Sequence, residues 1–188
     1  GTLDPMAEGV IVILLGEKRF EKRKYTRVRK EYIFDLTLGI STDTFDGMGM
    51  ITGENLSYDF QKEKLNNVIR ELKGLYSQKV PLYSAIKVKG ESMFEKARNN
   101  QENIAFPIKK GEIYKIEVIS IKEIDLKKHI CKIIENIKKV SGDFRQKEII
   151  KNWEDFLSRN EKNTLTIARI KVVTSSGIYV RGIARDIC

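Results

Sequence analysis

The residue best placed for chemistry is an aspartate near the start of the sequence, Asp4, which stands between Leu3 and Pro5. Proline fixes its own φ and pushes the residue before it toward an extended conformation, so the carboxylate should be held on a rigid loop. A rigid carboxylate can act as a nucleophile or as a general base. An Asp-Pro pair on its own more often marks a turn that the side chain closes through a hydrogen bond to the backbone. The chemical interpretation therefore depends on which other segments lie beside Asp4.

A tyrosine and an arginine near the other end of the sequence, Tyr179 and Arg181, are the next candidates. A strand through this segment would place both side chains on one face of a sheet, with their apolar neighbours on the core face, and a helix would begin at Gly182. An arginine on an inner face needs a carboxylate or phosphate partner. Asp4 and Asp46 are the candidate partners.

Asp46 lies in a polar loop with several glycines, residues 39–49, in which Asp43 is the other carboxylate. The loop lacks the number and spacing of oxygen ligands that a calcium loop needs. Two interpretations stay open. The loop is either closed by local side-chain hydrogen bonds, or it presents Asp46 to a positively charged neighbour.

The remaining pattern predicts an α+β fold. Residues 31–38 alternate as a half-buried strand that begins at Tyr32, whose ring either faces a cleft or packs in the core. The apolar run 10–15 predicts a buried strand directly behind the Asp4 loop. Further elements are expected as a helix over 60–72, strands over 113–121 and 165–173, and an αα-hairpin within 126–163.

Composition favours a polyanionic partner, because 35 Lys and Arg face 26 Asp and Glu, which gives a net charge of +9. The charge is densest in residues 18–30, which hold eight basic residues and one acid. This segment is either a solvated basic helix or a phosphate-binding strip. No apolar run is long enough to span a membrane. Cys131 and Cys188 are widely spaced, so we expect reduced thiols in a cytoplasmic protein. We expect no metal site, because His129 near Cys131 gives too few ligands to bind a metal ion.

Six short motifs, taken in order, resemble the TruB family of tRNA pseudouridine synthases. The similarity covers most of residues 1–125 and 164–188. The motifs are Gly1-Thr2-Leu3-Asp4-Pro5 with Ala7 and Gly9, Leu15-Gly16-Glu17, Lys30-Glu31-Tyr32, Gly39 with Ser41-Thr42-Asp43-Thr44-Phe45-Asp46, Pro81-Leu82-Tyr83-Ser84-Ala85-Ile86-Lys87 with Gly90, and Ser176-Gly177-Ile178-Tyr179-Val180-Arg181.

The resemblance implies the roles of individual residues. Asp4 matches the catalytic aspartate, and Tyr32 matches the tyrosine that stacks on the target base. Tyr179 matches the tyrosine lining the uracil pocket, and Arg181 the arginine that pairs with the catalytic carboxylate. Asp46 matches an acid near that arginine and the flipped nucleotide. The candidates for contact with RNA are Arg27, Arg29, Lys30 and Lys87.

The resemblance also implies the fold and the substrate. We expect a single catalytic domain over 1–188 with a mixed, mainly antiparallel sheet, an αα-hairpin insertion at 126–163 and no C-terminal PUA domain, hence a core fragment or a divergent copy. The expected activity is cofactor-free isomerisation of the T-loop uridine in the T-arm of tRNA, by a monomer. Two alternatives remain: a catalytically silent RNA-binding or RNA-chaperone module, and a pseudouridine synthase acting on another RNA. A basic domain with purely structural polar loops would leave the Tyr179 and Arg181 face without a partner.

Overall fold

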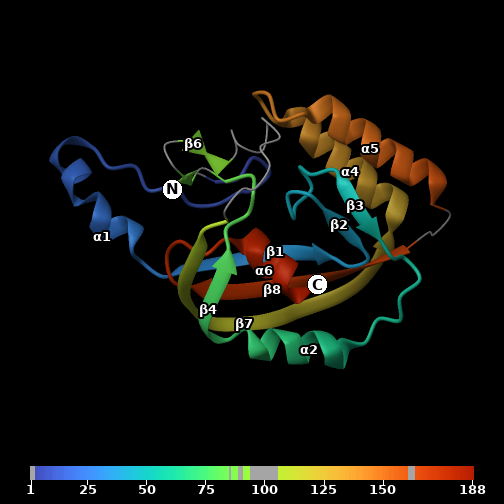
Figure 1. Ribbon diagram of the computed structural model, residues 1–188, viewed down its shortest axis with the longest axis horizontal. Coiled ribbons are helices and arrows are strands. Elements are labelled where there is room, and N and C mark those ends of the chain that lie inside the picture. Colours follow the sequence, from blue (N-terminus) through green and yellow to red (C-terminus); the bar gives the residue numbers. More distant parts are fainter. Residues whose placement is uncertain (1–2, 85, 89–90, 94–105, 161–163) are drawn as a thin grey trace.

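The fold is α+β and is built on an antiparallel sheet, as predicted (Figure 1). The computed structural model describes residues 3–84, 86–88, 91–93, 106–160 and 164–188. Four strands form the central sheet, and each neighbouring pair is antiparallel. In spatial order they are β1 (Lys30–Thr37), β8 (Thr164–Thr174), β7 (Ile108–Asp125) and β4 (Gly74–Lys79).

Strand β1 confirms the alternation in its sequence. Tyr32 and Phe34 are half-buried, Leu36 is buried, and the residues between them are exposed. Tyr32 pairs with Val172 of β8 in the ladder, so the aromatic ring lies on the core face of the sheet. Period-two burial of this kind follows from the opposite directions of successive side chains along a strand.

Two helices contribute to the core on this face of the sheet, α2 (Lys62–Glu71) and α6 (Val180–Ile187). The helix predicted within 60–72 corresponds to α2, and it buries Leu65 and Ile69 one turn apart. Helix α6 buries Ile183 at the same core. Because α6 carries Arg181, its packing on the sheet sets the position of that side chain.

A second core lies beyond the end of the sheet. It combines a two-stranded sheet, β2 (Ile40–Thr42) and β3 (Ile51–Glu54), with two helices, α4 (Leu126–Lys139) and α5 (Gln146–Arg159). The Asp125 carboxylate caps α4 by accepting a hydrogen bond from the Lys128 N–H (2.7 Å). Both helices fall inside the region where sequence periodicity predicts helices.

The remaining described elements are short: η1 (Gly16–Glu21), α1 (Lys22–Thr26), and the paired strands β5 (Lys87–Val88) and β6 (Glu91–Ser92). Helix α1 projects from the body of the molecule at the left of Figure 1. No helix in the described part of the chain combines the length and apolarity that a membrane span requires.

Strand β7 begins earlier and ends later than the predicted 113–121, and its ladder with β8 shifts register twice. The first shift lies between Ile113 and Lys115, and Ile113 is fully buried in the core. Tyr114 lies under the Arg29 guanidinium, whose carbon is 3.9 Å from the centre of the Tyr114 ring. A register shift reverses which face a side chain occupies, and the sequence gives no sign of it.

The buried strand predicted over 10–15 is wrong. This segment is neither helix nor strand and pairs with no described strand, and Val10 is 91% exposed. An apolar run becomes a buried strand only when a neighbouring strand and a packing face are available to it. Here the described residues supply neither, so these side chains face solvent.

An arginine fork on the outward face of the sheet allows a pH prediction. Nε and Nη2 of Arg169 each donate to one oxygen of Asp35 (2.7 Å each), across the β1–β8 ladder. The hydrogen bonds from Arg169 hold the pKa of Asp35 below its ordinary value. A lowered carboxyl pKa stabilises the fold above the unfolded-state pKa, and this contribution disappears as the pH falls through the folded-state pKa.

We therefore expect Asp35→Asn to lower the free energy of unfolding slightly at neutral pH, and to have much less effect at about pH 2, well below the ordinary pKa of Asp, because the contribution persists until the pH falls through the lowered folded-state pKa. The effect is small because both side chains are about half exposed. Urea denaturation of both proteins at each pH measures the difference. An equal loss at both pH values would show that the fork makes no pH-dependent contribution.

Candidate active site around Asp4 and Arg181

Asp4 lies on a tight turn, and Arg181 holds its carboxylate from one side. The Ala7 N–H donates to the Asp4 carbonyl (2.9 Å), and Pro5 takes the second position of the turn, where its fixed φ is favoured. Both carboxylate oxygens accept hydrogen bonds from Arg181, yet the Asp4 side chain is 49% exposed. The carboxylate is therefore fixed in direction and still accessible to a bound molecule.

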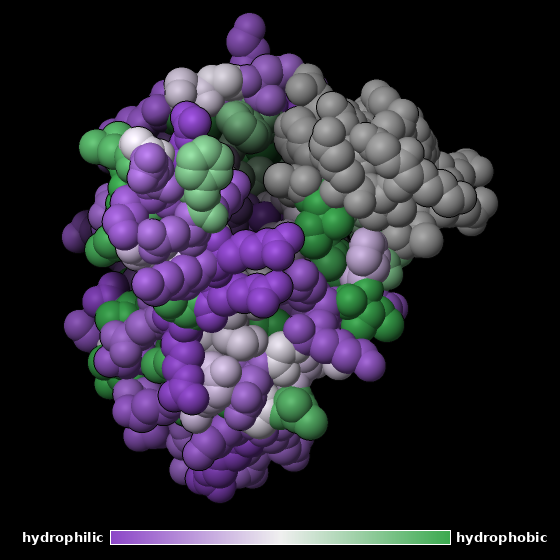
Figure 2. Space-filling model, turned by 90° about the vertical axis from the view of Figure 1, so that its left-hand side faces the viewer, coloured by the Kyte–Doolittle hydropathy of each residue, from purple (hydrophilic) through white to green (hydrophobic). Residues whose placement is uncertain are grey.

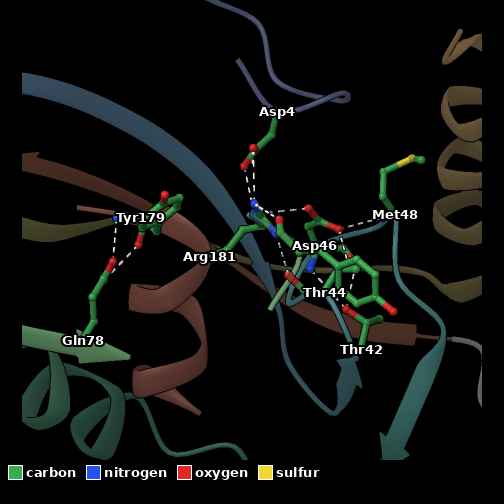
Figure 3. A network of polar contacts seen from close by, with 9 residues as sticks. Asp4, Thr42, Thr44, Asp46, Met48, Gln78, Tyr179 and Arg181 are labelled. Atoms are coloured by element: carbon green, nitrogen blue, oxygen red, sulfur yellow. Dashed lines mark hydrogen bonds and ion pairs between the residues drawn. The ribbon is translucent and has the colours of Figure 1, made fainter. Parts of the chain in front are cut away.

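Arg181 is the centre of the site, with only 10% of its side chain exposed. Nε donates to Oδ2 of Asp4 (2.8 Å) and Nη2 donates to Oδ1 (3.3 Å). Nη1 donates to the Thr44 carbonyl (3.3 Å), and Nη2 also donates to the Tyr83 carbonyl (3.1 Å). Three segments far apart in the sequence thus meet on one guanidinium, as Figure 3 shows for Asp4 and Thr44. A planar guanidinium held at each nitrogen has little freedom to turn.

Asp46 approaches the same nitrogen of Arg181 as Asp4 does, with Oδ2 of Asp46 3.6 Å from Nε (Figure 3). Its Oδ1 accepts hydrogen bonds from the Thr44 hydroxyl (2.6 Å) and the Met48 N–H (2.9 Å). Burial raises the pKa of Asp46 above its ordinary value, while the charge of Arg181 acts in the opposite direction. Phe45, with φ at +60°, makes the sharp turn between Thr44 and Asp46. Of the two interpretations of this loop, presentation of Asp46 to a positive charge is the one observed, and local hydrogen bonds hold it there.

Tyr179 is the residue that precedes helix α6, and a buried amide fixes its backbone. Oε1 of Gln78 accepts from the Tyr179 N–H (2.7 Å), and Nε2 donates to the Tyr179 carbonyl (3.3 Å). A Cβ at Gly182 would lie 2.7 Å from Nε2 of Gln78, so only glycine allows this contact. Gln78 therefore sets where the helix that carries Arg181 begins (Figure 3).

The prediction that Tyr179 and Arg181 share one face of a strand is wrong. Tyr179 is extended, but the helix begins at Val180, before the expected start at Gly182. Arg181, Gly182 and Ile183 are all buried in this helix, whereas successive residues of a strand would point to opposite faces of the sheet. The expected consequence still holds, since Arg181 does pair with Asp4 and lies beside Asp46.

Two phenol rings lie within the electrostatic range of Asp4. Burial raises the pKa of Tyr32 above its ordinary value, and the negative charge of Asp4 adds to the rise. Burial also raises the pKa of Tyr179, again with a contribution from Asp4. Both hydroxyls are therefore protonated donors at neutral pH. The site consists of two carboxylates, one guanidinium and two neutral phenols.

Three of the candidate RNA-contacting residues lie at or just before the start of β1, the strand that carries Tyr32. Arg27 and Arg29 are exposed between α1 and β1, and Lys30 begins β1. Figure 2 looks at the molecule from the side where α1 projects, and hydrophilic residues cover most of the described surface there. Within the basic segment, Glu21 pairs with Lys18 (2.8 Å). Lys87 begins β5, and its side chain lies outside the described residues.

Sequence reasoning did not find Gln78, Thr44 or Tyr83. Gln78 carries a detectable signal, because it alternates with Tyr76 and Val80 on the buried face of its segment. A polar side chain on a buried face must find partners, and here the partners belong to Tyr179. Thr44 and Tyr83 hold Arg181 through their carbonyls, a contact that no residue type reveals.

The arrangement suits acid–base or nucleophilic chemistry by a carboxylate. Arg181 fixes the direction of the Asp4 carboxylate, and the exposed side of that carboxylate can approach a bound substrate. Within the described residues, no group of His, Cys, Asp and Glu side chains could hold a metal ion.

An antiparallel α+β sheet that carries a buried Arg–Asp fork beside two phenols is the arrangement expected of a pseudouridylate synthase. The chain is matched over residues 1–133 by the family model described as TruB family pseudouridylate synthase (N terminal domain), and it belongs to this family.

Curated relatives agree with the family model. A protein of Caldanaerobacter subterraneus subsp. tengcongensis named tRNA pseudouridine synthase B is 31% identical over 188 residues, which is 100% of this chain and 51% of that protein. One of Caldicellulosiruptor saccharolyticus with the same name is 40% identical over 120 residues, covering 64% of this chain and 41% of the relative. A third, from Malacoplasma penetrans, is 37% identical over 131 residues (68% and 54%). The chain spans about half the length of the curated relatives it matches.

Proposed function

We propose that this chain isomerises a uridine of tRNA to pseudouridine, and that the uridine lies in the T-loop. The observation that carries the proposal is the geometry of Asp4, which is held by a buried guanidinium fork and is half exposed. The name tRNA pseudouridine synthase B of the relatives supports tRNA as the substrate. The choice of the T-loop follows from the family resemblance of the motifs.

The reaction is a rearrangement of one nucleotide. The bond between N1 of uracil and C1′ of ribose breaks, the base turns, and C5 bonds to C1′. The proton on C5 leaves, and N1 takes up a proton, so no atom is gained overall. Asp4 supplies the carboxylate that attacks C1′ or C6, or that removes the proton at C2′. In each case Arg181 holds the carboxylate in place and directs its lone pairs.

The target base must leave its stack before Asp4 can reach it. Tyr32 provides a ring on which the extruded uracil can stack, and Tyr179 lines the pocket beside it. Because burial raises the pKa of both phenols, each offers an O–H donor to the base and not a second negative charge next to Asp4. Asp46 lies close enough to Arg181 to contact the flipped nucleotide.

The T-arm itself is bound through its phosphates. The first candidates for phosphate contact are Arg27, Arg29 and Lys30. A further candidate is Lys87, at the end of the motif that begins at Pro81. Arg29 is oriented by its position over the Tyr114 ring. The protein acts as a monomer and needs no cofactor, since the carboxylate and the turning base carry out the whole rearrangement.

Release of tritium tests the proposal directly. A tRNA transcript made with uridine tritiated at C5 loses its label only when C5 forms the new bond. We expect tritium release with this chain and pseudouridine at a single T-loop position on mapping. Salt-dependent binding of the transcript without release would identify a silent RNA-binding module instead. Release from another position would retain the chemistry and exclude the T-loop.

A further inference from the structure

Helix α5 contacts the loop that holds Asp46. Three side chains, one from the residue before the helix and two from its middle, form hydrogen bonds to residues 43–51. This segment runs from Asp43 to the first residue of β3. The pairs are Arg145 Nη2 with Asp43 Oδ2 (2.9 Å), Trp153 Nε1 with the Gly49 carbonyl (3.1 Å), and Asn152 Oδ1 with the Ile51 N–H (2.7 Å). All three cross about a hundred residues of sequence, so they define tertiary structure and not local folding.

Arg145 makes the contact nearest to the site. Its φ is +62°, a left-handed conformation that is costly for arginine and that occurs here directly before α5. The guanidinium carbon lies 4.5 Å from the centre of the Tyr83 ring, while Nη2 pairs with Asp43. The side chains of Arg145 and Asp43 are only 24% and 22% exposed, which strengthens both interactions relative to a surface pair.

Each of the two residues that Arg145 contacts is linked to a carbonyl that accepts a hydrogen bond from Arg181. Asp43 immediately precedes Thr44, whose carbonyl accepts from Nη1 of Arg181. The carbonyl of Tyr83 itself accepts from Nη2 of Arg181. Arg145 therefore joins the two loops whose carbonyls hold the Arg181 guanidinium. Asp43 is fixed further by the Met50 N–H, which donates to its Oδ1 (2.9 Å).

The helix pair provides a rigid base for this connection. Ile149, Trp153 and Phe156 of α5 are buried in one core with α4, and Met48 of the Asp46 loop belongs to the same core. On the α4 side, a Cβ at Gly47 would lie 3.4 Å from the Ile133 side chain and 3.3 Å from that of Met6, just beyond Asp4. A displacement of α5 would therefore move the Asp46 loop, and the loop would move the acceptors of Arg181.

We propose that Arg145 is a positioning residue for the active site, and that helices α4 and α5 hold the Asp4–Arg181–Asp46 geometry through it. The role in turnover rests on the proposed function; the mechanical connection does not. Positioning within an ångström decides catalytic rate, because small displacements of a reacting group reduce turnover strongly.

The test compares Arg145→Gln with a matched variant of the same helix, Arg159→Gln. Arg159 is exposed at the end of α5 and bonds to the Asp155 carbonyl of its own helix. We expect Arg145→Gln to lower kcat about 10- to 100-fold, with KM for tRNA changed little. Arg145→Lys, which keeps the charge beside Asp43, should recover part of the loss. Arg159→Gln should turn over as wild type.

A second readout does not need activity. Amide hydrogen exchange at Met48 and Met50 reports the two N–H groups that donate to Asp46 and Asp43. We expect faster exchange at both amides in Arg145→Gln, but not in Arg159→Gln. Unchanged exchange and unchanged kcat in a folded Arg145→Gln protein would overturn the inference. If wild type releases no tritium, the proposed function fails, and the exchange data alone decide whether Arg145 holds the loop.

Discussion

Asp4→Asn should bind tRNA with nearly wild-type affinity and form no measurable pseudouridine. Asparagine has the shape of aspartate, and its carbonyl oxygen can still accept one hydrogen bond from Arg181, so the turn at Pro5 should persist. What disappears is the negative charge that attacks the nucleotide. We expect turnover to fall by about 10⁴-fold or more, the scale seen when the reacting group of an active site is removed. Tritium release at saturating tRNA measures the loss, and a filter-binding titration measures affinity.

Asp35→Asn is the matched control, because Asp35 also accepts a two-nitrogen fork from an arginine. That fork lies on the outward face of the sheet, whereas the Asp4 fork lies against the loop of Asp46. The control should retain full turnover. Substantial tritium release by Asp4→Asn would remove Asp4 from the reaction, whatever the behaviour of Asp35→Asn.

Two parts of the site could be predicted from the sequence: the strand that holds Tyr32 and the acidic partners of Arg181. Strand β1 was predictable because alternation is a local property, and the half-buried position of Tyr32 follows from it. The pairing of Arg181 with Asp4 and Asp46 was predictable for another reason. A buried guanidinium must find acidic partners wherever the chain places them. Neither inference required knowledge of the complete fold.

The errors arise where a local pattern depends on distant contacts. The run at 10–15 has the composition of a buried strand, but no described strand pairs with it. The segment around Tyr179 alternates like a strand, yet Gln78, about a hundred residues earlier, fixes its backbone and a helix begins at Val180. The left-handed backbone at Phe45 is likewise imposed by its surroundings, since phenylalanine itself disfavours it. Such features follow from the assembled structure and not from the period of the sequence.

Arg181→Lys should be the other variant with a large effect, although it preserves the positive charge. Arg181 satisfies both oxygens of Asp4 and two backbone carbonyls at once, and Nε also lies 3.6 Å from Asp46. An ammonium is a point charge with donors in a different arrangement, so it cannot reach Asp4 and the Thr44 and Tyr83 carbonyls together. We expect turnover to fall at least about 10²-fold, as for removal of an oriented electrostatic partner.

The same substitution should lower the free energy of unfolding by about 1–3 kcal/mol, because it leaves a buried carbonyl without a donor. Arg169→Lys is the control: it makes the same change in the exposed fork with Asp35, where water replaces a lost donor, and should alter stability less and turnover not at all. Urea denaturation and tritium release on wild type and both variants separate the two effects. If Arg181→Lys and Arg169→Lys proved equally mild in both measurements, a buried fork would not be what orients Asp4, since only burial and the additional carbonyls distinguish the two arginines.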